Sequence, residues 1–279
     1  MILIPVFSAI GAGLAGLVGW RQLDRRADRA EMERLLATQP ADPAPFTAGM
    51  VADLPEPARR FFTYAIAEGT PLHTVARLEM TGQFGMGDKA APGYMPMSAT
   101  QVLAAPHGFV WAMSGGTGTT RMAGSDSGSW TRFWLFGCAP VARFGGDPDH
   151  RRSAFGRYVA EAVFWTPAAV LPGPHVTWEP VSQNTARMIM RHAGLEQAVE
   201  VTVAEDGQPL HVAFQRWSNA NPEKVHRLQP FGGYLSEFRD FGGFRLPTHV
   251  EAGNNFGTDD YFPFFIADVT DIAFPKTDR

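Results

Sequence analysis

The sequence predicts an α+β fold that is mostly antiparallel β. We expect a curled, half-barrel-like sheet packed on one or two helices, preceded by one N-terminal transmembrane helix. Three observations support this prediction. Residues 2–20 contain no charged side chain. From residue 74 onward, short runs rich in β-branched and aromatic residues alternate with Gly, Pro, Asn and Asp. The connections between these runs are short, which favours antiparallel hairpins over parallel crossovers.

The first element is the uncharged segment, which predicts a transmembrane anchor at residues 1–20. At about 1.5 Å per residue, such a helix just crosses a hydrocarbon core of roughly 30 Å. A cleaved signal peptide and a soluble apolar helix are the alternatives. No Lys or Arg precedes the segment and no A-x-A-like site ends it, which disfavours the signal peptide. Arg21, Arg25 and Arg26 follow it, and the positive-inside rule then favours a cytoplasmic over a periplasmic body at a bacterial inner membrane.

Small residues recur along this segment. Gly11, Ala15 and Gly19 are spaced four apart, a pattern that lets two helix backbones approach closely. It predicts a homodimer through the transmembrane helix; the alternative is that Gly and Ala only fill a lipid-facing surface.

After the anchor we expect a helical stalk and a proline-rich linker at residues 21–46, then a single β-rich domain at residues 47–279. Pro40, Pro43 and Pro45 mark the linker. Asp53 is positioned to cap an amphipathic helix that Gly69 ends. A second helix is expected at residues 154–165, after a charged loop at 147–152.

Strands are predicted on both sides of the second helix, and tight turns separate several of them. They are residues 75–84, 97–104, 109–114, 119–123, 129–136, 186–192, 198–204, 210–217, 233–240, 244–252, 261–267 and 270–274.

Composition and motifs exclude several classes of function. A net charge of −4 without a basic stripe argues against a nucleic-acid partner. No two of the eight His lie at the spacing of a helical zinc motif, so we expect no metal, and no motif indicates a cofactor. Cys138 is the only cysteine and is interpreted as a small buried hydrophobe of unknown role. Residues 124–128, with Asp126 at their centre, are interpreted as a hairpin turn and not as a nucleophile elbow.

One charged pair stands out in the second expected helix, which Ser153 is positioned to cap. Arg157 and Glu161 lie four residues apart, on the face opposite an apolar stripe that includes Tyr158. If both helix faces are covered, the pair is buried and can bind a polar head group or perform acid–base chemistry, with His175 as a third candidate. If one face is wet, it is an ordinary surface pair.

The aromatic content, twenty-one Phe and seven Trp, predicts either a bulky core or an aromatic-lined cavity. In the second case, the candidate ligand-contacting residues are Trp111, Trp134, Tyr158 and Trp165.

The segments GRYVAEAVFWTP (residues 156–167) and LPEPARRF (residues 54–61) resemble an uncharacterised bacterial family of membrane-anchored proteins. The resemblance extends over residues 54–274 and implies no activity. The segment FGGFRLP (residues 241–247) resembles hairpins of lipoprotein carriers. That second resemblance implies a half-barrel around an apolar ligand, although such carriers are shorter and usually periplasmic.

Three functional hypotheses follow. The first is non-catalytic, membrane-tethered binding of a lipid or another apolar small molecule. The second is an enzyme acting on a small apolar substrate, with Arg157 and Glu161 as polar site residues. The third is a structural or protein-interaction module that exposes an apolar patch.

Overall fold

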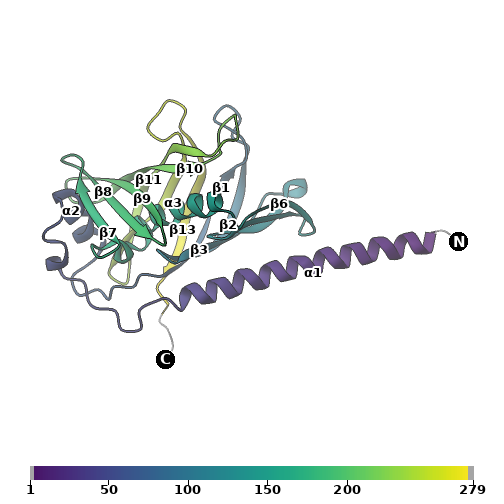
Figure 1. The fold of residues 1–279 in the computed structure, drawn as a ribbon, viewed down its shortest axis with the longest axis horizontal. Coiled ribbons are helices and arrows are strands. Elements are labelled where there is room, and N and C mark those ends of the chain that lie inside the picture. The colour runs from purple at the N-terminus through teal and green to yellow at the C-terminus, as the bar shows by residue number, and fades with distance from the viewer. Residues whose placement is uncertain (1–2, 276–279) are drawn as a thin grey trace.

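The computed structural model describes residues 3–275, with the side chains of residues 3–12 and 14 left out of the description. Its strands form one curled antiparallel sheet with a long helix outside it and a shorter one inside it (Figure 1). The predicted α+β, mainly antiparallel fold is therefore confirmed. The helices are α1 (Leu3–Leu36), α2 (Glu56–Ala65) and α3 (Pro148–Trp165).

The strands are β1 (Ala76–Gly85), β2 (Tyr94–Ala104), β3 (Gly108–Gly115), β4 (Met122–Ser127), β5 (Trp130–Leu135), β6 (Ala139–Gly145), β7 (Val176–Pro180), β8 (Thr185–His192), β9 (Leu195–Val203), β10 (Pro209–Ser218), β11 (Arg227–Phe241), β12 (Phe244–Asn254) and β13 (Phe262–Ala273). Three short 3-10 helices, η1 (Ala48–Val51), η2 (Gly118–Thr120) and η3 (Pro167–Val170), complete the described elements.

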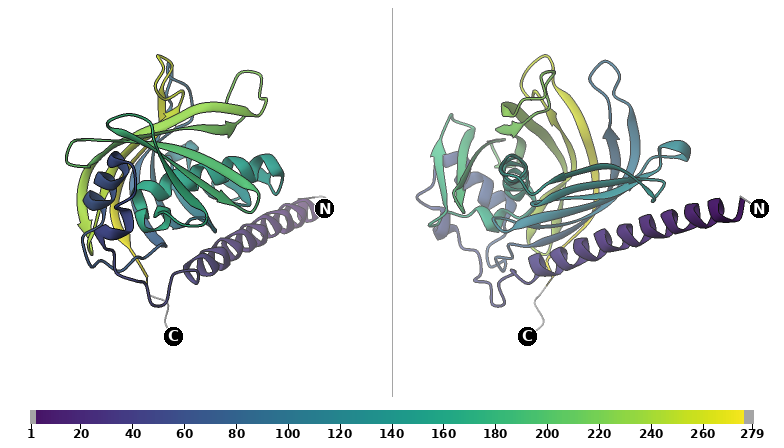
Figure 2. Two further views of the ribbon diagram at one scale, coloured as in Figure 1. Left: turned by 60° about the vertical axis from the view of Figure 1, so that its left-hand side comes forward. Right: turned by 45° about the vertical axis from the view of Figure 1, so that its right-hand side comes forward.

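The strand order explains where α3 lies. It runs β6-β5-β4-β3-β2-β1-β13-β12-β11-β10-β9-β8-β7, so two up-and-down meanders meet where β1 pairs with β13. The chain leaves the first meander at one sheet edge, β6, and enters the second at the opposite edge, β7. The connecting segment, α3 and η3, runs from one edge to the other across the concave side of the curled sheet, which we call the inner face (Figure 2).

The α3 sequence suits this enclosed position. Asp147 caps the helix by accepting from the His150 backbone N–H at 2.8 Å, and Pro148 occupies the first turn. Phe155, Tyr158 and Val163 are buried against the sheet. A helix that is apolar on most sides requires cover on most sides, and the curl supplies it.

Helix α2 closes one end of the inner face. The rings of Phe61 and Phe62 contact Trp178 of β7, with centroids 5.9 and 5.3 Å away. Both phenylalanines are fully buried, as the amphipathic pattern of this segment predicts.

Helix α1 lies on the opposite, outer face of the sheet (Figure 2). Its last turns pack on β2 and β3, where Leu35 joins an apolar cluster with Val102 and Val110. Among the described residues, no helix is both long and apolar enough to cross a membrane. Most side chains of the predicted anchor, residues 1–20, lie outside the described part of the structure.

The structure corrects several local predictions. Residues 124–127 continue strand β4 and are not a turn, and the charged residues 148–152 are the first turns of α3. Asp147 caps that helix in place of Ser153. Strands β6 and β7 were not predicted, and the two final predicted strands are one, β13. In the strands, sheet pairing overrides weak local propensity, whereas α3 starts earlier because Asp147 and Pro148 form a better N-terminus than Ser153.

Candidate functional site

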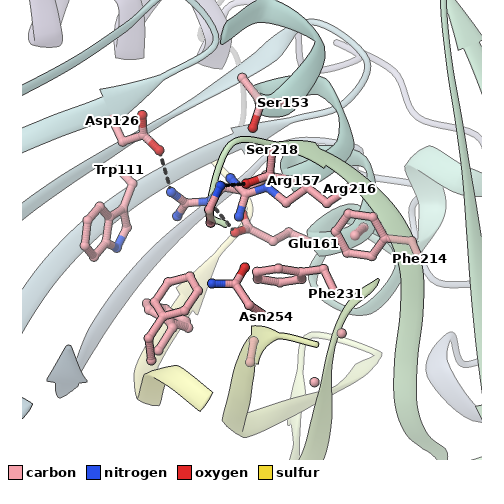
Figure 3. Close-up of a pocket in the computed structure, with 18 of the residues that line it drawn as sticks. Trp111, Asp126, Ser153, Arg157, Glu161, Phe214, Arg216, Ser218, Phe231 and Asn254 are labelled. Carbon is pink, nitrogen blue, oxygen red and sulfur yellow. Dashed lines mark hydrogen bonds and ion pairs between the residues drawn. The ribbon is translucent and has the colours of Figure 1, made fainter. Parts of the chain in front are cut away.

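A cavity of about 340 Å³ lies between α3 and the inner face of the sheet. Its walls come from both meanders and from one side of α3 (Figure 3). This volume is within the range of small-molecule sites, roughly 300–1,000 Å³. The fold therefore leaves the space inside the curl partly unfilled.

Most of the lining is aromatic and aliphatic. Trp111 of β3 contacts Phe84, Phe133 and Phe265, with ring centroids 5.9 to 6.4 Å apart. On the other side, Phe231 contacts Phe214 at 5.3 Å. These rings come from strands far apart in the sequence, which the curl brings around one space.

A charged cluster from α3 and β4 enters this apolar surrounding. The Arg157 guanidinium donates from Nη1 to Asp126 Oδ2 at 2.7 Å and from Nε to Glu161 Oε1 at 2.8 Å. Glu161 Oε2 accepts from Gln101 Nε2 at 2.6 Å, and Asp126 Oδ1 accepts from the Thr131 hydroxyl at 2.5 Å. Every carboxylate oxygen of this cluster thus has a donor.

Arg157 is held in its charged form. Burial acts to lower the pKa of its guanidinium, but the carboxylates of Glu161 and Asp126 outweigh burial, and the net pKa is raised. The guanidinium also lies 4.7 Å from the Phe109 ring centroid and 5.3 Å from that of Trp111. Arg157 is a structural cation that joins α3 to the sheet.

A second arginine in the cavity has different surroundings. Arg216 of β10 lies over the Phe231 ring at 4.9 Å, and its Nε atom is buried without a hydrogen-bond partner in the described chain. Burial, assisted by the neighbouring Arg157 charge, lowers the pKa of Arg216 to about 10. It remains a cation at neutral pH, but an incompletely solvated one.

Four of the residues selected from sequence meet in this cavity. Arg157, Glu161, Trp111 and Trp165 all line it, and the Trp165 indole N–H donates to the Pro247 carbonyl at 3.3 Å. Both sides of α3 are covered, so the Arg157–Glu161 pair is largely buried, with side chains 17% and 13% exposed.

The other three lie elsewhere. Tyr158 faces the packed core beside Phe109 and donates to the Pro106 carbonyl at 3.2 Å. Trp134 lies on the outer face, because successive residues of β5 point to opposite sides of the sheet and Phe133 takes the inner position. His175 is exposed near the β7 edge, beside His192 and outside the cavity lining.

Sequence reasoning missed Asp126 and Arg216. Asp126 was hidden because its glycine- and serine-rich segment was interpreted as a turn. Arg216 could have been found from the sequence. It follows Val212 and Phe214 at alternate positions of one strand, so the side chain of Arg216 is expected on the same inward face as these apolar residues. In the part of the chain that the structure describes, no group of His, Cys, Asp or Glu is arranged to hold a metal ion.

Comparison with protein families identifies the chain. A family of unknown function, DUF6544, matches residues 44–266. The chain belongs to this family. The family assignment confirms the resemblance to an uncharacterised family noted from residues 54–61 and 156–167. Among curated proteins, none matches the sequence.

Comparison with solved structures finds two proteins of low sequence identity. One is the LolA superfamily protein NE2245 from Nitrosomonas europaea, with a TM-score of 0.38, 8% identity, and coverage of 80% of this chain and 93% of that chain. The other is a domain from Vibrio parahaemolyticus assigned to outer membrane lipoprotein sorting, with a TM-score of 0.36, 10% identity, and coverage of 72% and 85%.

Proposed function

We propose that this protein binds an apolar small molecule, such as a lipid, in the cavity between α3 and the inner face, without performing chemistry on it. The observation that carries the proposal is the cavity itself, about 340 Å³ of space whose lining is mostly aromatic and aliphatic. Protein interiors are normally close-packed, and an apolar space of this size is a site for an apolar ligand.

The charged cluster favours binding over acid–base catalysis. Glu161 and Asp126 each pair with Arg157 and each accept a second side-chain hydrogen bond, from Gln101 and Thr131, so the protein itself fixes both carboxylates in place. His175, the third residue of the enzymatic hypothesis, does not line the cavity. The geometry therefore supports a holding role for Arg157 and Glu161.

The test uses N-phenyl-1-naphthylamine, a neutral apolar dye whose fluorescence rises in an apolar site. We expect saturable binding to the protein, and about tenfold weaker binding to the variant Ala252→Phe, which places a ring in the cavity. Ala213→Phe is the matched control, because Ala213 lies on β10 of the same sheet and does not line the cavity. Absence of saturable dye binding, or equal loss in both variants, contradicts the proposal.

Membrane tethering through residues 1–20 is a second part of the proposal and is supported by the sequence alone. The uncharged segment and the arginines that follow it predict that the full chain sediments with membranes and resists extraction by alkaline carbonate. Release of the intact chain into the supernatant contradicts this part and leaves the cavity proposal unaffected.

A further inference from the structure

Among the described residues, the cavity lining contains buried polar atoms without a hydrogen-bond partner. Arg216 Nε and the Trp111 indole Nε1 are both buried N–H donors without a partner among the described residues. His150 Nδ1 also lacks a partner, and it can donate or accept according to its tautomer. Gln101 Oε1 is an unpartnered acceptor, but Gln101 does not line the cavity. A molecule that supplies acceptor oxygens would satisfy what the protein leaves open.

The position of Arg216 makes it the main unsatisfied group. It occupies an inward position of β10, in register with Gln229 of β11, and follows Val212 and Phe214 on the same strand face. Arg157 and the Phe231 ring lie beside it, and the charges of Asp126 and Glu161 act on it from beyond ion-pair distance (Figure 3). A guanidinium at an apolar strand position is costly unless it is paired.

The carboxylates nearby do not pair with it. Asp126 and Glu161 form their ion pairs with Arg157, at 2.7 and 2.8 Å, and no carboxylate of the described residues lies within ion-pair distance of Arg216. Arg157 therefore has two anionic partners and Arg216 has none. Arg216 is half-buried, and a bound anion can therefore supply the direct counter-ion that the described chain does not.

We propose, on the basis of the proposed function, that the bound molecule is a single-chain amphiphile with a carboxylate head, and that Arg216 binds this head. The planar guanidinium offers the fork of donors that suits a carboxylate. The hydrocarbon tail would lie among the rings of Phe84, Phe264 and Phe265, which line the cavity without polar atoms. Arg216 is then the residue that determines specificity, and the aromatic walls supply most of the affinity.

The experiment compares ligands that differ only in the head. Dodecanoate, methyl dodecanoate and dodecanol are each used to displace N-phenyl-1-naphthylamine from the full chain at neutral pH. We expect dodecanoate to compete at about tenfold lower concentration than the ester or the alcohol, the difference that a charge-assisted hydrogen bond produces. In Arg216→Met this preference disappears while the dye still binds, because methionine keeps the cavity apolar.

Two further variants sharpen the result. Arg216→Lys keeps the positive charge but lacks the paired N–H donors of a guanidinium, so we expect part of the preference for dodecanoate to remain. Arg187→Met removes an exposed arginine paired with Glu200 and keeps the full preference.

The outcomes separate the two proposals. If the dye does not bind, the proposed function fails, and this inference fails with it. If the dye binds but the ester competes as well as dodecanoate, or if Arg216→Met keeps the preference, the cavity is a binding site and the carboxylate assignment is wrong. The assignment stands only when the preference exists and depends on Arg216.

Discussion

The two faces of this sheet carry two contrasting charged clusters. On the outer face, Asp24 of α1 accepts hydrogen bonds from Arg132 at 3.1 Å, from Arg143 at 2.6 and 3.0 Å, and from the Trp134 indole at 2.8 Å. On the inner face, Arg157 is similarly paired, but Arg216 beside it has no ion-pair partner in the described chain. Strand β5 contributes to both clusters, because its alternate residues face opposite sides of the sheet: Arg132 faces outward and Thr131 binds Asp126 on the inner face.

The difference in hydrogen-bond partners separates a cluster that stabilises the fold, around Asp24, from a candidate binding site, around Arg216. Around Asp24 one carboxylate meets two arginines and an indole N–H, so the cluster attaches α1 to β5 and β6 without any added molecule. At Arg216, by contrast, the Nε atom has no hydrogen-bond partner in the described chain, and the side chain borders the largely apolar cavity. Unsatisfied buried groups in native proteins mark places where a ligand or water belongs. Arg21, whose Nε and Nη1 are also unpartnered, is the exception on the outer face and adjoins the predicted anchor.

The largest effect is expected from breaking the outer cluster. Asp24→Ala leaves Arg132, Arg143 and the Trp134 indole without their shared acceptor. We expect the free energy of unfolding to fall by about 2 to 4 kcal/mol, somewhat reduced because both arginines are partly exposed. Urea denaturation measures it, with Asp42→Ala, an exposed site, as the control. An Asp24→Ala effect no larger than that of the control would show that α1 is not attached through this cluster.

The next effect comes from the paired arginine of the inner cluster. Arg157→Met leaves Asp126 and Glu161 facing each other without their common cation. We expect a fall of about 2 to 3 kcal/mol in the free energy of unfolding, because two largely buried carboxylates lose the cation they share. Urea denaturation measures it, with Arg187→Met, an arginine of a more exposed ion pair, as the control. A loss no larger than that of the control would contradict the structural role of Arg157.

The comparison is sharpest at Arg216. Since this arginine has no ion pair to lose, Arg216→Met is expected to leave the free energy of unfolding unchanged or to raise it by up to about 1 kcal/mol. The same denaturation series measures it beside Arg157→Met. A loss as large as that of Arg157→Met would mean that Arg216 is structural and that the two arginines do not differ as we infer.

The smallest effect concerns pH and lies outside both clusters. Burial acts to lower the pKa of His249, but Asp268 at 2.7 Å and Glu251 at 3.4 Å raise it above the ordinary value. A raised pKa in the folded state gives stability that is complete below the ordinary pKa and is lost as the pH rises through the folded pKa. His249→Gln should remove this loss between about pH 6 and pH 8, a change of about 0.5 kcal/mol at this partly exposed site. Identical pH profiles of the two proteins would contradict it.

The sequence predicted the sheet better than the site. Alternating runs and short turns identified most strands and the antiparallel class, because both signals are local. Which strands form the edges is not local: β6 and β7 are short and weakly patterned, and they are strands because their neighbours supply hydrogen-bond partners. The enclosed position of α3 follows from those edges, and so it could not be read from its own sequence.

The site residues also divide into those that local sequence patterns predict and those that depend on the tertiary fold. Arg157 and Glu161 were found because helical spacing places them together, and Trp111 and Trp165 followed from aromatic content. Trp134 was placed in the cavity by mistake. Trp134 and Phe133 face opposite sides of the sheet, and which of the two faces inward depends on the register of β5. Arg216 could have been found from its alternation with Val212 and Phe214, whereas its lack of a partner depends on the side chains that the fold brings near it.

The inner face is proposed to hold an amphiphile by its apolar tail and its carboxylate head. A crystal structure of the full chain with dodecanoate brominated at its terminal carbon would show both ends of the ligand, because the anomalous signal locates the bromine. We expect bromine among Phe84, Phe264 and Phe265 with the carboxylate at Arg216. A cavity without bromine, or bromine bound only elsewhere on the protein, would contradict it.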